Sequence, residues 1–321
     1  MARLLDQIVG HEAAIDHLQH LKRTDRWPHA LLFAGPSGIG KRQCALAFAQ
    51  ILICERQQQG CGECPACLRV AKRQSESLIL ISPDESAAKP VIKVDVIREL
   101  LSSLSLAALG VCRVVIIDEA HTMNQQAANS LLKTLEEPME NVYFILIGED
   151  VQQFLPTIRS RTQVIRFSYL RETELQAIRP GLPQWSYRSS RGQLDRLSLL
   201  TTEEGLKKRD EALSLFEDFC QNKEFLLWSD WKTVLKDRGM AQFSVSCWQQ
   251  IVRDLIVLKT ASSQFILNTD QLLRFEQLSA VGSGRLSKLA QELVYAEQDL
   301  MMNADPVLVF ESLWVKYDRM D

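Results

Sequence analysis

Residues 35–42, Gly-Pro-Ser-Gly-Ile-Gly-Lys-Arg, match the phosphate-binding pattern G-x-x-x-x-G-K-[ST] at every fixed position except the last. In such a loop, backbone N–H groups surround a nucleotide's phosphates, the lysine reaches the terminal phosphates, and the hydroxyl ligates Mg²⁺. The candidate nucleotide contacts are Gly35, Gly38, Gly40 and Lys41. Arg42 stands at the hydroxyl position, and a guanidinium has no acceptor atom with which to ligate a metal. We therefore expect no Mg²⁺ site, and weak or absent binding of ATP or ADP.

The sequence around this loop has the order strand, loop, helix that a phosphate-binding loop requires. Residues 30–34 form an apolar run that ends at the loop, and apolar residues recur at helical spacing from 44 to 52. Further apolar runs at 78–82, 113–117 and 142–147 predict three more strands, with helical patterns between them. Alternating strands and helices predict an α/β domain built on a parallel sheet that is covered on both faces.

The second half of the chain reads differently, because the strand pattern stops. Residues 169–205 resemble a small helical segment, and residues 206–321 are helical throughout. Apolar stripes in this last part, such as the one through Trp248 and Leu255, are typical of a packed core. We therefore predict three domains, at 1–168, 169–205 and 206–321.

Two acids, Asp118 and Glu119, end the apolar run at 113–117. In nucleotide hydrolases with a phosphate-binding loop, the first acid at such a position supports Mg²⁺ and the second polarises the attacking water. The alternative is a strand end capped by solvated acids. The loop earlier in the chain favours the first interpretation and adds both acids to the candidate nucleotide site.

Four of the eight cysteines, Cys54, Cys61, Cys64 and Cys67, fall within one short segment. Four thiolates at this spacing are typical of a tetrahedral zinc site, and closed coordination would make the zinc structural. A redox C-x-x-C pair and chance clustering are the alternatives. The segment 54–67 is therefore predicted to be a zinc module. The other four cysteines are scattered and read as small buried hydrophobes.

The composition is that of an ordinary globular protein, with 46% hydrophobic and 24% charged residues in a chain of 321. The net charge of −3 gives no general reason to expect nucleic-acid binding. No apolar run approaches the roughly 20 residues of a membrane span, and the start of the chain lacks the features of a secretory signal. We expect a cytoplasmic protein with no membrane partner.

Arg161 lies in the tripeptide Ser160-Arg161-Thr162. An arginine at a subunit edge can reach a neighbour's γ-phosphate and act as an arginine finger. A surface arginine with no such role is the alternative, and the tripeptide by itself does not decide between them.

Taken together, these features resemble the bacterial DNA polymerase III clamp-loader subunits of the AAA+ superfamily, over essentially the whole chain. The opening residues 8–11 with 29–33, the four-cysteine insertion, and the segment 129–138 (Asn-Ser-Leu-Leu-Lys-Thr-Leu-Glu-Glu-Pro) are similar to that family. Ser160-Arg161-Thr162 sits where the family carries Ser-Arg-Cys. The resemblance implies an AAA+ phosphate-loop domain with a zinc-binding insertion, a helical lid domain at 169–205 and an oligomerising collar at 206–321.

Three departures from the family's ATPase members each affect a residue that would contact Mg²⁺ or phosphate. Arg42 replaces the hydroxyl, Gly148 replaces a polar residue that senses the γ-phosphate, and Asp195 falls, within one residue of alignment, where an arginine contacts phosphate. An acid at that last position would repel phosphate. The combination resembles the delta-prime type of subunit, which would supply Arg161 in trans without being an autonomous ATPase.

The resemblance also implies the partners of the chain. These are the gamma/tau and delta clamp-loader subunits, with the sliding clamp and primer-template DNA reached through the complex and contacted at phosphates only. Asp118 and Glu119 would then be inherited with reduced catalytic value. A catalytically active gamma-like subunit that tolerates Arg42, and a stand-alone AAA+ motor, remain as alternatives.

Overall fold

The computed structural model describes residues 3–24, 27–56, 60–84, 91–104, 112–221, 224–227, 230–260 and 263–320. Residues 57–59 of the predicted zinc module therefore lie outside the described residues. The chain divides into two compact units, one formed by residues 1–180 with 192–194, and the other by residues 181–191 with 195–321. The predicted division into three domains stays a prediction.

The first unit is built on a five-stranded parallel sheet in the order β2-β3-β4-β1-β5. The strands are β1 (Ala30–Ala34), β2 (Leu78–Ile81), β3 (Arg113–Ile117), β4 (Val142–Gly148) and β5 (Gln163–Arg166). Every residue of β1 and β3 is buried, as expected for parallel strands covered on both faces. Four strands were predicted from apolar runs, and β5 was missed.

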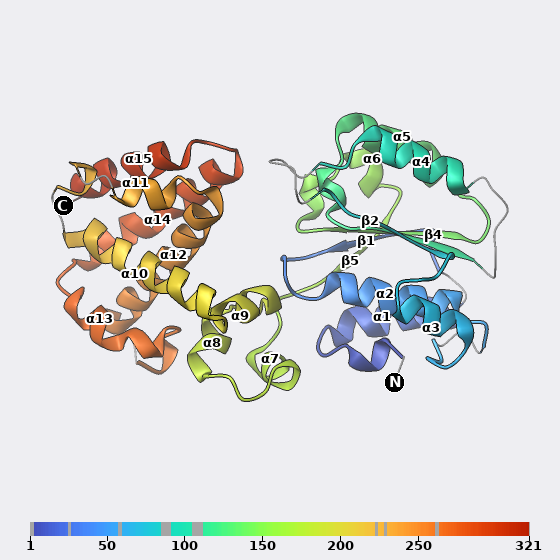
Figure 1. Cartoon of the computed structure of the whole chain (residues 1–321), viewed down its shortest axis with the longest axis horizontal. Coiled ribbons are helices and arrows are strands. Elements are labelled where there is room, and N and C mark those ends of the chain that lie inside the picture. Colours follow the sequence, from blue (N-terminus) through green and yellow to red (C-terminus); the bar gives the residue numbers. More distant parts are fainter. Residues whose placement is uncertain are drawn as a thin grey trace. The chain divides into compact units, whose positions relative to one another are not determined.

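Alternate residues of each strand enter two separate hydrophobic clusters. Leu31 and Phe33 pack with α1, α2 and α3, whereas Leu32 and Ala34 pack with α4, α5 and α6. Figure 1 shows these two sets of helices on opposite faces of the sheet. The helices are α1 (Glu12–Arg23), α2 (Lys41–Ile53), α3 (Pro65–Ala71), α4 (Val94–Leu104), α5 (Gln125–Glu136), α6 (Pro156–Arg159) and α7 (Glu172–Ile178). The predicted α/β fold, with a parallel sheet covered on both faces, is confirmed.

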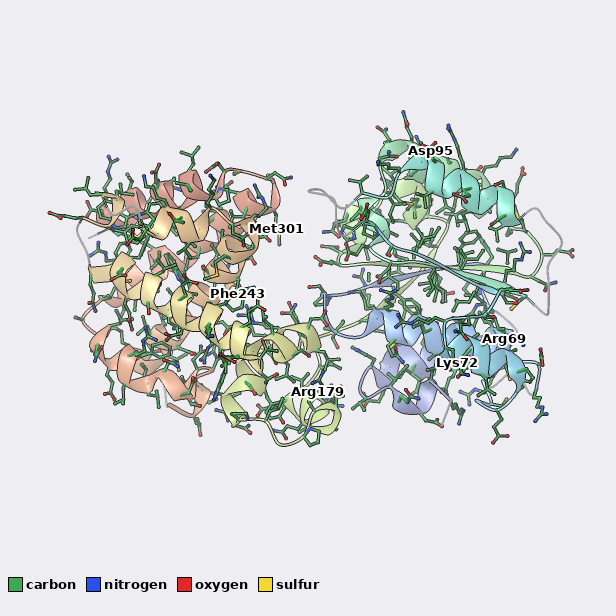
Figure 2. All side chains as sticks on the ribbon, viewed as in Figure 1. Arg69, Lys72, Asp95, Arg179, Phe243 and Met301 are labelled. Atoms are coloured by element: carbon green, nitrogen blue, oxygen red, sulfur yellow. The ribbon has the colours of Figure 1, made fainter. Side chains whose placement is uncertain are left out.

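Short 3₁₀ helices and exposed side chains complete this unit. The 3₁₀ helices are η1 (Leu5–Gln7), η2 (Ala120–Thr122) and η3 (Val151–Gln153). Figure 2 shows Arg69 and Lys72 beside α3 on one side of the sheet and Asp95 of α4 on the other. The outer surfaces of both helical layers therefore carry charged side chains, while the apolar residues face the sheet.

The described residues of the second unit form helices joined by turns and short loops, and none of them forms a strand. Its elements are α8 (Gln184–Ser189), α9 (Leu194–Leu200), α10 (Glu203–Gln221), η4 (Phe225–Leu227), α11 (Asp230–Leu235), α12 (Arg238–Thr260), η5 (Ser263–Phe265), η6 (Thr269–Gln271), α13 (Leu272–Gln277), α14 (Ser283–Met301) and α15 (Pro306–Asp318). Helix α12 packs against α10 and α14. Trp248 of α12 is completely buried, its ring lies 5.3 Å from that of Phe216 and 5.1 Å from that of Phe310, and its Nε1–H donates to the carbonyl of Ala212. The predicted helical C-terminal region is confirmed.

Candidate functional site

The glycine loop lies between β1 and α2, where a parallel sheet presents the carboxyl ends of its strands. Gly40 is the N-cap of α2 and has a φ of 96°, a conformation that L side chains rarely adopt. The first residue of the helix is Lys41, so the loop delivers the lysine directly at the helix N-terminus. This is the local geometry in which backbone N–H groups can face phosphate oxygens.

Lys41 makes its closest contacts with the loop itself. Its Nζ donates to the carbonyl oxygens of Gly35 and Pro36, each at 2.6 Å, and the residue is buried. Phosphate oxygens would have to compete with two short hydrogen bonds to bind this ammonium group. The loop therefore has the form of a phosphate cradle, with its lysine engaged by its own carbonyls.

Arg42 and Asp118 are brought together although 75 residues separate them in the sequence. The Nη1 of Arg42 lies 3.5 Å from Oδ2 of Asp118, which follows the carboxyl end of β3. In a loop of the hydrolytic type, the residue at position 42 and the first acid both support Mg²⁺. Here the guanidinium of Arg42 supplies a positive charge beside the acid.

Glu119 has the left-handed backbone conformation, with a φ of 46°, and its N–H donates to Oδ1 of Asp118 at 3.1 Å. This hydrogen bond and the Arg42 pair engage both carboxylate oxygens of Asp118. Both oxygens of this carboxylate therefore have a charged or polar partner within the chain.

Gly148, the last residue of β4, lies against the ring of Phe154. A Cβ atom added at Gly148 would come within 2.4 Å of that ring, closer than real Cβ contacts. The ring of Phe154 therefore occupies the volume in which a polar side chain at position 148 would stand. Sequence reasoning noted the glycine and missed the phenylalanine, which belongs to no motif.

Replacing Gly148 by threonine is expected to lower the free energy of unfolding by about 1–3 kcal/mol, because the new side chain would overpack against Phe154. Thermal denaturation of the variant measures this loss. In the background of Phe154→Ala, which itself removes a buried ring, the same glycine-to-threonine change should cost less, since the smaller residue leaves room for the threonine. Equal stability of wild type and Gly148→Thr would contradict the close contact.

The segment around Asp195 touches the glycine loop through the two residues that precede this acid. The backbone N–H of Leu194 donates to the carbonyl of Gly38 at 2.6 Å, and Nε2 of Gln193 donates to the carbonyl of Ser37 at 3.2 Å. Asp195 is exposed. The arginine one position later, Arg196, is engaged within the second unit, where its Nη1 donates to Ser246.

Arg161 follows the short helix α6, and its contacts come from its own chain. Its Nη2 lies 2.7 Å from Oε1 of Glu136, the last residue of α5. Its Nη1 donates to the carbonyl of Thr157 at 3.0 Å and to Oγ of Ser160 at 3.1 Å. One third of the side chain is exposed. A group from another molecule could therefore reach the guanidinium.

The sulfur atoms of the four predicted metal ligands, Cys54, Cys61, Cys64 and Cys67, all lie within 4.8 Å of one another. Zn–S bonds of 2.3 Å in a tetrahedron place sulfurs about 3.8 Å apart, and the Cys61 and Cys67 sulfurs are 3.9 Å apart. A disulfide needs about 2.05 Å, so this pair is not one. The cluster has the donor set and spacing of a metal site.

Backbone N–H groups around the sulfurs favour the thiolate at Cys61, whereas burial raises the pKa of the Cys67 thiol. The N–H groups of Cys61, Cys64 and Cys67 point at the sulfurs of Cys54, Cys61 and Cys64 respectively, at 3.3–3.4 Å. Hydrogen bonds from the backbone of Glu63 and Cys64 lower the pKa of the Cys61 thiol to about 6. Thiolate is the form that ligates a metal, and such second contacts orient it.

A cavity of about 260 Å³ lies beside the start of α1, and the sequence gave no warning of it. Its lining includes His11, Arg171 and Glu174. Burial alone would raise the pKa of Glu174, but hydrogen bonds from Arg171 lower it. Cavities that bind small organic molecules are mostly apolar, so the charged lining of this cavity is atypical of such a binding site.

None of the helices in the described part of the chain combines the length and apolar character needed to span a bilayer.

Comparison with known proteins places this site in a family. The family model described as DNA polymerase III, delta subunit matches residues 10–171, which include the glycine loop, the cysteine cluster and Arg161. The chain is 43% identical over 136 residues to DNA polymerase III subunit delta' of Pseudomonas aeruginosa, covering 41% of each protein. It is 27% identical over 263 residues to subunit delta' of Bacillus subtilis, covering 79% of each.

The chain also resembles DNA polymerase III subunit tau/gamma of Haemophilus influenzae, at 29% identity over 290 residues. That match covers 89% of this chain and 39% of the relative. The chain thus matches about two fifths of the length of the Pseudomonas protein and about two fifths of the length of the Haemophilus protein. The predicted resemblance is confirmed: the chain belongs to the DNA polymerase III delta-subunit family, among members named subunit delta'.

Proposed function

We propose that the chain is a delta'-type subunit of the DNA polymerase III clamp loader that does not hydrolyse ATP itself and that supplies Arg161 to the ATP site of a neighbouring subunit. The observation that carries the first part is the ion pair between Arg42 and Asp118, at 3.5 Å. It places a positive side chain where hydrolysis needs Mg²⁺, and like charges repel.

Two further features support an inert loop. Lys41 is bonded to the carbonyls of Gly35 and Pro36, and the ring of Phe154 fills the space beside Gly148. Lys41, Gly38 and the other loop residues can still hold a nucleotide or another anion weakly, because the backbone N–H groups of the loop are retained. Asp118 and Glu119 are, in this proposal, inherited residues with little catalytic value.

The isolated chain tests the proposal. We expect its rate of MgATP hydrolysis to equal that of its Lys41→Ala variant, measured as phosphate release. The variant Arg42→Thr restores the hydroxyl, but it should not restore hydrolysis, because Phe154 still fills the neighbouring position. Turnover that Lys41→Ala abolishes would overturn the proposal in favour of an active gamma-like ATPase.

The proposed partners are the gamma/tau and delta subunits, and the sliding clamp and primer-template DNA are reached through the complex. The proposal is supported by the sequence similarity to relatives named delta' and tau/gamma. Sedimentation of the purified chain separates this view from a stand-alone motor. We expect a monomer that enters a complex only when partner subunits are added, whereas a homohexamer would favour the motor.

We further propose that Cys54, Cys61, Cys64 and Cys67 hold one structural zinc ion. Four sulfurs at tetrahedral spacing would leave no coordination site for water or substrate. When bound, the zinc would cross-link the segment after α2 to the start of α3, and it would take no part in catalysis.

A further inference from the structure

The segment 129–138, which carries the family resemblance in the sequence, contributes no residue to the glycine loop or to the cysteine cluster. Its last helical residue is Glu136, at the end of α5. In the structure, Oε1 of Glu136 is 2.7 Å from Nη2 of Arg161. The segment therefore contacts the one residue that is proposed to act on another subunit.

The fold fixes the two partners relative to each other. Leu135, next to Glu136, and Ile158, three residues before Arg161, belong to the same buried cluster. The ring Nε2–H of His29 donates to the carbonyl of Leu135 at 2.9 Å, which anchors the end of α5 to the start of β1. Packing of Leu135 and Ile158 in the core therefore determines the backbone positions that bring Glu136 beside Arg161.

In this pair, the side chain of Arg161 is folded back onto its own chain. Its Nη1 donates to the carbonyl of Thr157 and to Oγ of Ser160, both on its own turn. Nη2 is taken by Glu136. Two of the three guanidinium nitrogens are therefore engaged within the chain, and a phosphate on a neighbouring molecule would have to displace these contacts.

Glu136 is also an unusual residue for its place. A carboxylate at the C-terminal end of a helix meets the negative end of the helix dipole, which destabilises it. Arg161 compensates this charge at 2.7 Å. Both side chains remain partly exposed, 33% for Arg161 and 49% for Glu136, so water screens the pair and it can open.

We propose that Glu136 is a positioning residue for Arg161: it holds the guanidinium in the folded-back orientation until the greater negative charge that develops on a neighbour's γ-phosphate in the transition state replaces it. This inference rests on the proposed role of Arg161. In it, Glu136 sets the basal rate of ATP hydrolysis at the neighbouring site, and the signature segment gains a function.

The test uses the complex reconstituted with gamma/tau and delta subunits. The variant Glu136→Gln keeps the shape of the side chain and removes its charge. We expect it to raise kcat for basal ATP hydrolysis at the neighbouring site about two- to five-fold, the range that the loss of an exposed ion pair implies. KM for ATP should stay constant, because the nucleotide binds to the loop of the other subunit.

The matched control is Glu137→Gln, which removes a charge from the adjacent exposed residue and should leave kcat unchanged. The double variant Glu136→Gln/Arg161→Ala should hydrolyse ATP no faster than Arg161→Ala, because Glu136 acts through Arg161. A merely structural role for Glu136 would not produce this dependence.

Three results would overturn the inference. Glu136→Gln could match Glu137→Gln, it could lower kcat, or it could raise turnover equally without Arg161. If any of these is found while Arg161→Ala still loses activity, only the role of Glu136 fails. If Arg161→Ala leaves turnover unchanged, the proposed function and this inference fail together.

Discussion

Replacing Arg161 by alanine is expected to slow ATP hydrolysis at the neighbouring subunit's site by about 10³-fold or more, the usual range for loss of an arginine finger. The guanidinium would stabilise charge that develops on the transferred phosphoryl group, an interaction made in the transition state. Single-turnover hydrolysis in the reconstituted complex measures this site directly. Steady-state turnover sums every ATP site of the complex and should therefore fall by less wherever other sites also hydrolyse ATP.

The matched control is Arg159→Ala. Arg159 lies at the end of α6, two residues before Arg161, and its Nη1 donates to Oε1 of Gln152 at 2.6 Å. Removing it deletes the same charge from the same turn, so it should leave single-turnover hydrolysis almost unchanged. Equal losses in both variants would point to a general effect of charge or folding, and unchanged hydrolysis in Arg161→Ala would remove the assignment.

The sequence predicted the four strands whose residues are mostly apolar. The strands β1 and β3 have the predicted bounds, because Ala30–Ala34 and Arg113–Ile117 are apolar runs set between turn residues and helices. It missed β5, since Gln163–Arg166 has polar ends and pairs only with β1 at the sheet edge. Only Val164 and Ile165 of this strand are apolar, so its pattern is too weak to recognise, whereas β2 at the opposite edge is apolar throughout and was predicted.

The candidate site shows a different limit of sequence reasoning. The pattern G-x-x-x-x-G-K-[ST] identifies Arg42 as a departure, because the serine or threonine expected there would ligate Mg²⁺. Nothing in the sequence places Arg42 beside Asp118, or the ring of Phe154 against Gly148. Those contacts depend on how β3 and β4 are ordered in the sheet, which is a property of the tertiary fold. The roles of the individual site residues stay predictions.

The cysteine cluster was the easiest part to predict, because its ligands are close in sequence and need little tertiary information. Its attachment to the rest of the unit was not predictable. Gln50 of α2 donates through Nε2 to the carbonyl of Cys67 at 3.1 Å, and its Oε1 accepts from the N–H of Leu4. Helix α2 starts at the glycine loop, so the proposed zinc site supports the helix that holds this loop.

Loss of the zinc is expected to lower the free energy of unfolding of the first unit by at least about 4 kcal/mol, because structural metal sites contribute their binding free energy to folding. For a unit of this size, the melting temperature should fall by about 10 °C. The variant Cys64→Ser removes one ligand, and a strong chelator removes the metal from wild type. Both should unfold the segment around α3 and weaken the packing of α2.

Metal analysis and thermal unfolding together decide the outcome. Freshly purified, unchelated protein should contain one zinc ion per chain, and Cys64→Ser should contain less. Cys220→Ala is the control, because Cys220 lies in α10, outside the cluster, and its loss should leave the zinc content unchanged. A chain without stoichiometric zinc would end the assignment. A redox pair would instead give a protein whose stability follows the thiol reductant and is indifferent to the chelator, since only a metal site ties folding to metal concentration.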